Sequence, residues 1–109
     1  MAEGKNEARE NMNTEQIQEY TKKSRGKMQV QISSFAKGLE VFEKISIIRV
    51  RSKKSKLLIM EDYMPIIGEL DGDIDLIGKD VHHSLENIKG FFCHEHNVFF
   101  LLLKESYHA

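Results

Sequence analysis

The chain has 109 residues, a formal net charge of -1 and 40% hydrophobic residues, which is typical of one soluble globular domain. This near-zero charge provides no overall field that would attract nucleic acid or a membrane surface. The single cysteine, Cys93, excludes an internal disulfide, so a reducing, cytoplasmic location is the simpler expectation. No apolar segment typical of a signal peptide stands at the N-terminus, and the longest apolar run is much shorter than the about 20 residues that span a membrane. We therefore expect membrane contact only through a partner protein.

The N-terminal part of the chain is polar and carries too few apolar side chains to fold alone. A helix over 13–24 is predicted inside it, because Asn13 and Gln16 stand at the two positions of a capping box. Ile17 and Tyr20 would lie on one face of this helix and form an apolar surface that can pack on the rest of the domain. The alternative is a frayed tail.

After this polar part, apolar and polar residues alternate with the period of a half-buried β-strand. Asp71-Gly72 and the segment His94–Asn97 are typical of hairpin turns, and a change of phase at Ile47-Ile48 indicates a bulge or a strand that switches sheets. The predicted strands are Met28–Ser33, Leu39–Glu43, Ile45–Arg51, Lys56–Glu61, Ile66–Leu70, Asp73–Ile77, Ile88–Cys93 and Val98–Lys104.

Many short strands separated by turns at this spacing predict an all-β fold, namely a β-sandwich of antiparallel strands. The chain is then divided into a polar extension at 1–26, a sandwich domain at 27–105 and a short tail at 106–109.

Several motifs within these strands follow the pattern of a known family. Leu58-Ile59-Met60 and Pro65 stand where that family has a Gly-Ile-Leu sequence and a later proline, and Gly68-Glu69-Leu70 follows at a similar spacing. Lys89-Gly90-Phe91 keeps one glycine of the family's Gly-Gly-Phe turn. Together with the order of the strands, these motifs resemble the N-terminal β-sandwich of the F-type ATP synthase epsilon subunit.

The resemblance implies a non-catalytic protein-interaction module, either a rotor stalk component or a relative of it, with rotor subunits as partners and no cofactor. The family's C-terminal helical hairpin would begin where this chain ends, so neither inhibition of ATP hydrolysis nor ATP binding is expected. Two loops depart from the family pattern, at Lys53-Lys54 and at Asp62-Tyr63. Because these loops face the membrane ring in the family, the resemblance makes Lys53, Lys54, Asp62 and Tyr63 candidate partner-binding residues.

The last predicted strand is apolar on both of its faces, whereas a strand with one solvated face should alternate. One alternate set of side chains can fill the core, and the other set then needs a cover. We assign Phe99, Leu101 and Leu103 as partner-binding candidates, with Val98, Phe100 and Leu102 as the other set. The cover could be the N-terminal helix, a second copy in a homodimer or another protein. The alternative is that both faces lie inside one core.

A competing function is a free-standing protein that uses the sandwich to bind metal or nucleic acid. His82, His94 and His96 are weak candidate metal ligands, because their spacing does not match a structural zinc site, and no metal is expected. His94 and His96 are otherwise predicted to be solvated, and Cys93 to be buried and inert. A basic run from Arg49 to Lys56 lacks the aromatic residues that stack on bases, which disfavours nucleic acid.

Overall fold

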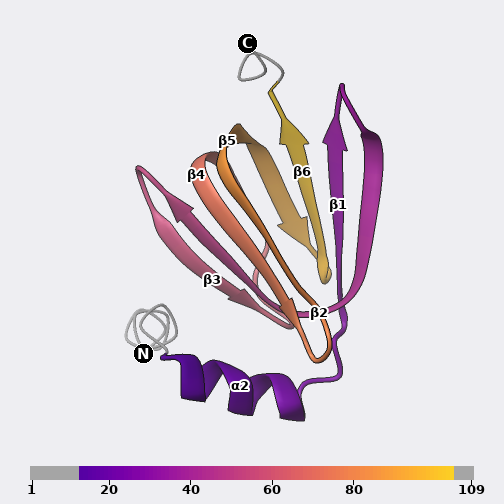
Figure 1. The fold of residues 1–109 in the computed structure, drawn as a ribbon, viewed down its shortest axis with the longest axis vertical. Coiled ribbons are helices and arrows are strands. Elements are labelled where there is room, and N and C mark those ends of the chain that lie inside the picture. The colour runs from indigo at the N-terminus through magenta and orange to yellow at the C-terminus, as the bar shows by residue number, and fades with distance from the viewer. Residues whose placement is uncertain (1–12, 105–109) are drawn as a thin grey trace.

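The computed structural model describes residues 13–104, so residues 1–12 and the predicted tail at 106–109 lie outside the described part of the chain. One helix and six strands are found between these limits (Figure 1). They are α2 (Thr14–Lys23), β1 (Met28–Ser34), β2 (Gly38–Ser52), β3 (Lys56–Met60), β4 (Ile66–Gly78), β5 (His82–Glu95) and β6 (Val98–Leu103).

The all-β prediction is confirmed, but the predicted sandwich is not, because the strands close into a barrel. Hydrogen bonds link the strands in the order β1-β6-β5-β4-β2-β3, and β1 also pairs with β2. The pairing of β1 with β6 is parallel, and every other pairing is antiparallel. Five strands therefore form a closed ring, and β3 is attached to the outside edge of β2.

The closure depends on β2, whose 15 residues were predicted as two separate strands. Its first half pairs with β1 and its second half pairs with β3 and β4. The change of partner coincides with Lys44, which has a positive φ of 61°, and with a break of register between Ile45 and Ile47. The predicted change of phase at Ile47-Ile48 thus lies directly beside a real irregularity.

The predicted hairpin at Asp71-Gly72 is wrong, since β4 continues through both residues. A side chain at Gly72 would place its Cβ 2.1 Å from the carbonyl oxygen of Arg51 on the neighbouring strand. The glycine is therefore needed because two backbones approach closely beside a bulge in β4, and it does not form a turn. The chain reverses instead after Gly78 and at His96-Asn97, where both residues have positive φ as in a type I′ turn.

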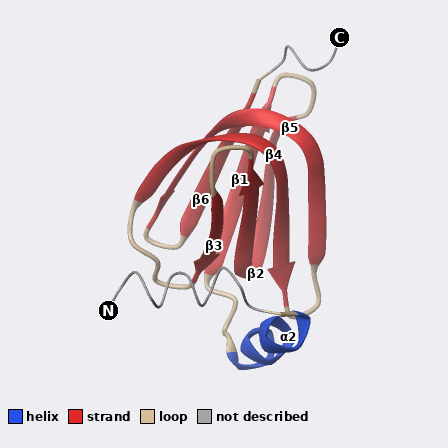
Figure 2. Cartoon of the chain, turned by 90° about the vertical axis from the view of Figure 1, so that its left-hand side faces the viewer, coloured by secondary structure: helices blue, strands red, loops and turns tan. Residues whose placement is uncertain are grey.

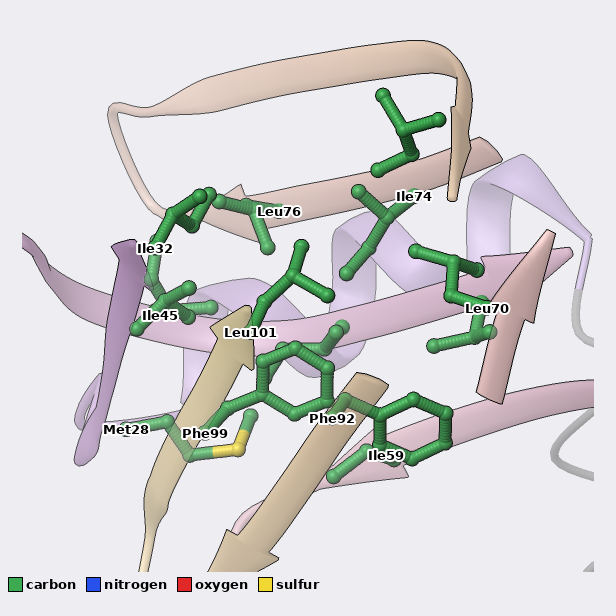
Figure 3. Packing of buried hydrophobic residues seen from close by; sticks show 14 of the residues in the cluster. Met28, Ile32, Ile45, Ile59, Leu70, Ile74, Leu76, Phe92, Phe99 and Leu101 are labelled. Carbon is green, nitrogen blue, oxygen red and sulfur yellow. The ribbon is translucent and has the colours of Figure 1, made fainter. Parts of the chain in front are cut away.

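The inside of the barrel is filled by one side-chain set from each strand, and Figure 3 shows these residues interlocking across the ring. The rings of Phe92 and Phe99 stack with their centroids 5.4 Å apart. The fully buried large side chains are Met28, Ile32, Ile45, Ile47, Ile48, Ile59, Leu70, Ile74, Leu76, His94, Phe99 and Leu101.

The predicted N-terminal helix is confirmed, including both hydrogen bonds of the capping box between Asn13 and Gln16. It lies below the barrel and packs on the outer face of β2 and β3 (Figure 2). Ile17 forms a second small core there with Ile47, Leu58 and Met60. None of the helical structure within residues 13–104 has the length and apolar character needed to cross a membrane.

Candidate functional site

The last strand separates its side chains into a buried set and an exposed set. Phe99, Leu101 and Leu103 point into the barrel, and Phe99 and Leu101 are completely buried. Their assignment as partner-binding residues is therefore wrong, because a side chain enclosed by its own core cannot touch a second molecule. The alternate residues of β6 take the exposed position, and the expectation that the other set of this strand lies on the surface is confirmed.

Exposed apolar side chains continue from β6 across its neighbours on the outside of the barrel. Phe100 of β6 is paired with Cys93 of β5, which is paired in turn with Ile67 of β4. Phe91 and Leu102 form the adjacent cross-strand pair. Side chains that are paired across neighbouring strands lie on the same face of a sheet, so these residues are contiguous. We call them the outer apolar face, consisting of Ile67, Phe91, Cys93, Val98, Phe100 and Leu102.

The prediction that Cys93 is buried is wrong, because Cys93 is exposed in the middle of the outer apolar face. The alternation along β5 explains the error, since Phe92 and His94 take the two inward positions on either side of it. Across β1, Leu39 and Val41 extend the apolar character, with Ser33 and Gln31 of β1 in the same rows. The β1 side of the face is thus more polar than its centre.

The two loops that the family resemblance suggested as partner contacts do not come together. Lys53 and Lys54 precede β3, whereas Asp62 and Tyr63 follow it, so the two pairs lie at opposite ends of this strand. Both lysines are exposed. The ammonium group of Lys53 lies 3.7 Å from the carboxylate of Asp71, and that of Lys54 lies 3.8 Å from the carboxylate of Glu69. These exposed ion pairs contribute little stability, so both lysines remain accessible to a partner.

The Asp62 loop is tied to the rest of the barrel. The side-chain amide of Asn97 donates to the Asp62 carboxylate at 3.0 Å, and the Asp62 backbone N–H donates back to the Asn97 side chain at 2.7 Å. The hydrogen bond from the Asn97 side chain is the main reason why the pKa of Asp62 lies below its ordinary value of 3.8, and the nearby positive charge of Lys27 is the second reason. Tyr63 packs partly buried against the core. This loop is therefore occupied by internal contacts.

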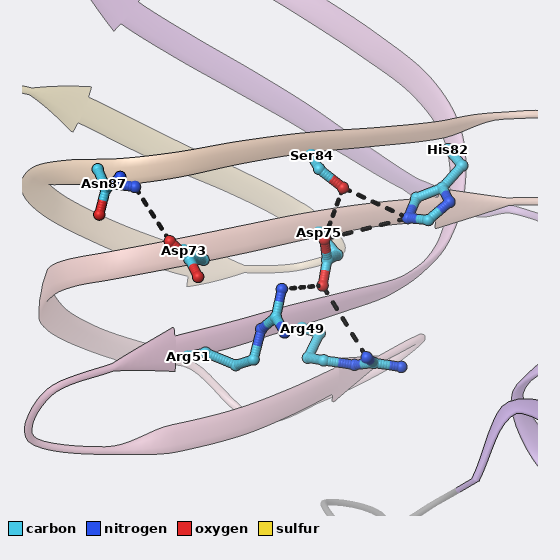
Figure 4. Close-up of polar contacts among 7 residues, drawn as sticks. All are labelled: Arg49, Arg51, Asp73, Asp75, His82, Ser84 and Asn87. Atoms are coloured by element: carbon cyan, nitrogen blue, oxygen red, sulfur yellow. Dashed lines mark hydrogen bonds and ion pairs between the residues drawn. The ribbon is translucent and has the colours of Figure 1, made fainter.

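A group of charged residues that sequence reasoning did not combine lies on the outside of β2, β4 and β5 (Figure 4). Its centre is Asp75, whose side chain is only 7% exposed. Arg51 donates to one Asp75 oxygen at 2.9 Å, and the hydroxyl of Ser84 donates to the other at 2.7 Å. Arg49 and His82 each lie 4.0 Å from the carboxylate. Asp75 is therefore nearly enclosed by its neighbours, although it lies on the outside of the barrel.

The sequence did contain a signal for this group. Arg49 and Asp75 are directly opposite each other in the pairing of β2 with β4, as are Arg51 and Asp73. Alternating arginines on one strand and alternating aspartates on another are typical of a cross-strand charge ladder. The signal was missed because the predicted hairpin at Asp71-Gly72 placed these aspartates beside the wrong strand.

A cleft of about 610 Å³ lies next to this group, between the helix and the end of the β4–β5 hairpin. Arg49, Arg51, Asp75 and His82 line its charged side. Its volume is within the range of about 300–1,000 Å³ that is usual for small-molecule pockets. The cleft therefore has the size of a small-molecule pocket and a charged wall.

The three histidines named as candidate metal ligands do not converge. His82 lies beside Asp75, His96 is exposed in the β5–β6 turn, and His94 is fully buried in the barrel. Within residues 13–104, no group of three or more His, Cys, Asp or Glu side chains could hold a metal ion. The prediction that His94 is solvated is wrong, since its place in β5 turns it inward beside Phe99 and Tyr63.

Comparison with known proteins supports the fold and leaves the family open. No protein-family model matches the sequence, and no curated protein matches it. Among solved structures, the chain is similar to one chain in the cryo-EM structure of the Tetrahymena thermophila mitochondrial ATP synthase central stalk/c-ring. The TM-score is 0.57 and the sequence identity is 17%, over 75% of this chain and 66% of the other.

This similarity concerns the fold, because identity of this order carries no information on shared activity. The chain shares a β-rich fold with this chain of the central stalk/c-ring structure, which agrees with the all-β fold predicted from the sequence. The match spans slightly less than two thirds of the other chain. Kinship with the epsilon subunit itself stays a prediction.

Acid is expected to destabilise the protein through His94. Both ring nitrogens of His94 are buried without a hydrogen-bond partner among the described residues, and burial lowers the pKa of His94 below its ordinary value of 6.5. The unfolded chain therefore binds a proton more readily than the folded chain, so stability falls as the pH drops below about 6.5 towards the lowered pKa. Urea unfolding at pH 7.5 and at pH 5.0 measures this loss.

In the His94→Leu variant, the acid-dependent loss should shrink, and stability at pH 7.5 should be unchanged or about 1 kcal/mol higher, because an unsatisfied polar ring is removed from the core. His96→Asn serves as the control, since the His96 side chain is 87% exposed and Asn tolerates the positive φ of 51° at this turn position, so the variant should show the same acid-dependent loss as the wild type. An equal acid sensitivity in the wild type and in His94→Leu would contradict this role of His94.

Proposed function

We propose that this chain is a non-catalytic protein-interaction module that docks on another protein through its outer apolar face. The observation that carries the proposal is the cross-strand continuity of Phe91, Phe100, Leu102 and Ile67, all of which are exposed on one side of the barrel. Contiguous exposed apolar surface of this kind is typical of partner sites. A central-stalk protein of a rotary ATP synthase is the partner class that the fold similarity favours.

The helix α2 shows how such a face can be covered. On the opposite side of the molecule, Ile17 packs on Ile47, Leu58 and Met60 and buries them. The outer apolar face offers side chains of the same type without a covering element from residues 13–104. We therefore infer that the partner presents an apolar helical stripe, and that any association with a membrane is indirect, through this partner.

Three of the four loop residues suggested by the family resemblance have a smaller part in this proposal. Lys53 and Lys54 are accessible and place positive charge before the start of β3, where it could contact an acidic part of the partner. Asp62 is already hydrogen-bonded to Asn97. Binding of metal has less support, because the candidate histidines point to three separate places. Binding of nucleic acid has less support, because Arg51, Lys53 and Lys54 of the basic run each lie beside a carboxylate.

The double variant Phe100→Ser/Leu102→Ser tests the proposal. Burying a large apolar side chain contributes roughly 1.5–3 kcal/mol, so losing two of them should weaken binding to purified central-stalk subunits by at least about 100-fold. The measurement is isothermal titration calorimetry with the full chain. Phe35→Ser/Met64→Ser is the matched control, because both side chains are exposed and apolar but lie outside the outer apolar face.

Equal binding by the double variant and the wild type would contradict the proposed docking face. If the wild type does not bind the stalk subunits but sediments as a dimer that the double variant loses, the face joins two copies of this chain. That result would overturn the stalk partner while keeping the face.

A further inference from the structure

The cleft beside Asp75 has a structure that the proposed docking function does not use. It lies on the side of the barrel covered by α2, so it is separate from the outer apolar face. Arg49 and Arg51 come from alternate positions of β2, and both side chains reach the same opening. Some of the polar side chains in this cleft hold Asp75 in place, and another is available to bind a ligand.

Arg51 and Ser84 serve to hold Asp75. Together they give each carboxylate oxygen a hydrogen bond, at 2.9 Å and 2.7 Å, in a position where the carboxylate is nearly buried. A buried carboxylate needs such partners, since its desolvation is otherwise costly. Asp75 is thus satisfied by these two residues.

Arg49 is placed differently. Its nearest approach to Asp75 is 4.0 Å, which is an ion-pair distance without a direct hydrogen bond, and its side chain is 34% exposed. The guanidinium group carries five N–H donors in a planar fork, so Asp75 orients this group without using up its donors. Arg49 therefore faces the cleft as a positioned cation with bonding capacity to spare.

The rest of the cleft limits the chemistry of a ligand. Three basic side chains, those of Arg49, Arg51 and Lys79, line it against two acidic ones, those of Asp75 and Asp80, so basic groups outnumber acidic groups in the wall. The apolar side chains of Ile17, Ile77 and Val81 form another part of the wall. A molecule that fits both parts has an anionic head and a small apolar body.

We propose that this cleft binds a small carboxylate ligand, with the carboxylate held by the fork of Arg49 and the apolar body against Ile17, Ile77 and Val81. A planar carboxylate matches the guanidinium fork with two parallel hydrogen bonds, which a point charge such as lysine cannot supply. The cleft volume of about 610 Å³ leaves room for such a molecule.

The test is an NMR titration of the ¹⁵N-labelled full chain with benzoate as the probe. The expected result is saturable binding with a dissociation constant of about 1 mM or tighter, with shifted amides among residues 14–18, 49–51 and 75–82. Arg49→Gln should weaken binding about tenfold or more, as expected for loss of a charge-assisted hydrogen bond, and Arg49→Lys should restore only part of it.

Lys53→Gln is the control, because it removes the same charge from an exposed loop outside the cleft, and it should bind benzoate like the wild type. Inorganic phosphate and cyclohexanemethanol are titrated in parallel to separate the contributions of the anion and the apolar body. The proposal is overturned if the wild type shows no saturable shifts, if the shifted amides lie elsewhere, or if Lys53→Gln weakens binding as much as Arg49→Gln. The titration of the wild-type chain can overturn the proposal by itself, so the result does not depend on whether a variant folds.

Discussion

Replacing Phe99 by alanine is expected to lower the free energy of unfolding by about 3–5 kcal/mol, the usual cost of emptying a large aromatic site in a core. Phe99 is fully buried, and its ring stacks on Phe92. Since small domains have a total stability of only about 5–15 kcal/mol, this single change should bring the chain close to unfolding at room temperature. Urea or thermal unfolding followed by circular dichroism measures the loss.

The neighbouring residue supplies a matched control. Phe100→Ala removes the same side chain from the next position of β6, where the ring is 36% exposed on the outer apolar face. Its cost should be about 1 kcal/mol, because no enclosed cavity is created. Similar losses for the two variants, or the reverse order, would show that β6 does not turn Phe99 inward and Phe100 outward.

The second large effect is expected at Gly72. A Cβ atom there would lie 2.1 Å from the carbonyl oxygen of Arg51, so Gly72→Ala must push β2 and β4 apart at the end of their pairing. We expect a loss of about 3 kcal/mol, at the upper end of the range for overpacking, because backbone yields less readily than a side chain. The measurement is the same unfolding experiment.

Gly68→Ala on the same strand is the comparison. Its Cβ would meet the far edge of the Phe92 ring at 2.7 Å, and a ring edge can move where a hydrogen-bonded carbonyl cannot. The loss at Gly68 should therefore be clearly smaller than the loss at Gly72. If Gly72→Ala were harmless, the bulge in β4 would not require a glycine, and the backbones of β4 and β2 would not approach as closely as described.

Much of the fold could be predicted from local pattern. The capping box at Asn13 identified the helix, the alternation in β1 identified the first strand, and the apolar run at 98–103 identified the last one, because these signals depend on a few neighbouring residues. The closure into a barrel could not be predicted in this way. It depends on β2 bending at Lys44 to pair with different strands on each half, and single positive φ values at a lysine have no reliable sequence signal.

The functional surfaces were only half predictable. The run Val98–Leu103 showed that β6 is apolar on both faces, but the identity of the outward set depends on the register with β5, which the sequence does not specify. The group around Asp75 can be predicted only if the pairing of β2 with β4 is known. That pairing was missed because Gly72, which permits close approach of two backbones, was interpreted as part of a turn. These errors have a common cause, because long-range strand pairing decides which side chains become neighbours and which of them turn inward.

The parallel pairing of β1 with β6 also bears on how the protein is made. Gln29 lies opposite Val98, so the first and last strands of the barrel can meet only after the intervening residues have left the ribosome. Until then β1 has an unpaired edge, which is a site for wrong pairing with other chains. Contacts between residues so distant in sequence also slow folding. The newly synthesised chain should therefore be most vulnerable to aggregation just before β6 emerges, and the emergence of this last strand completes the ring.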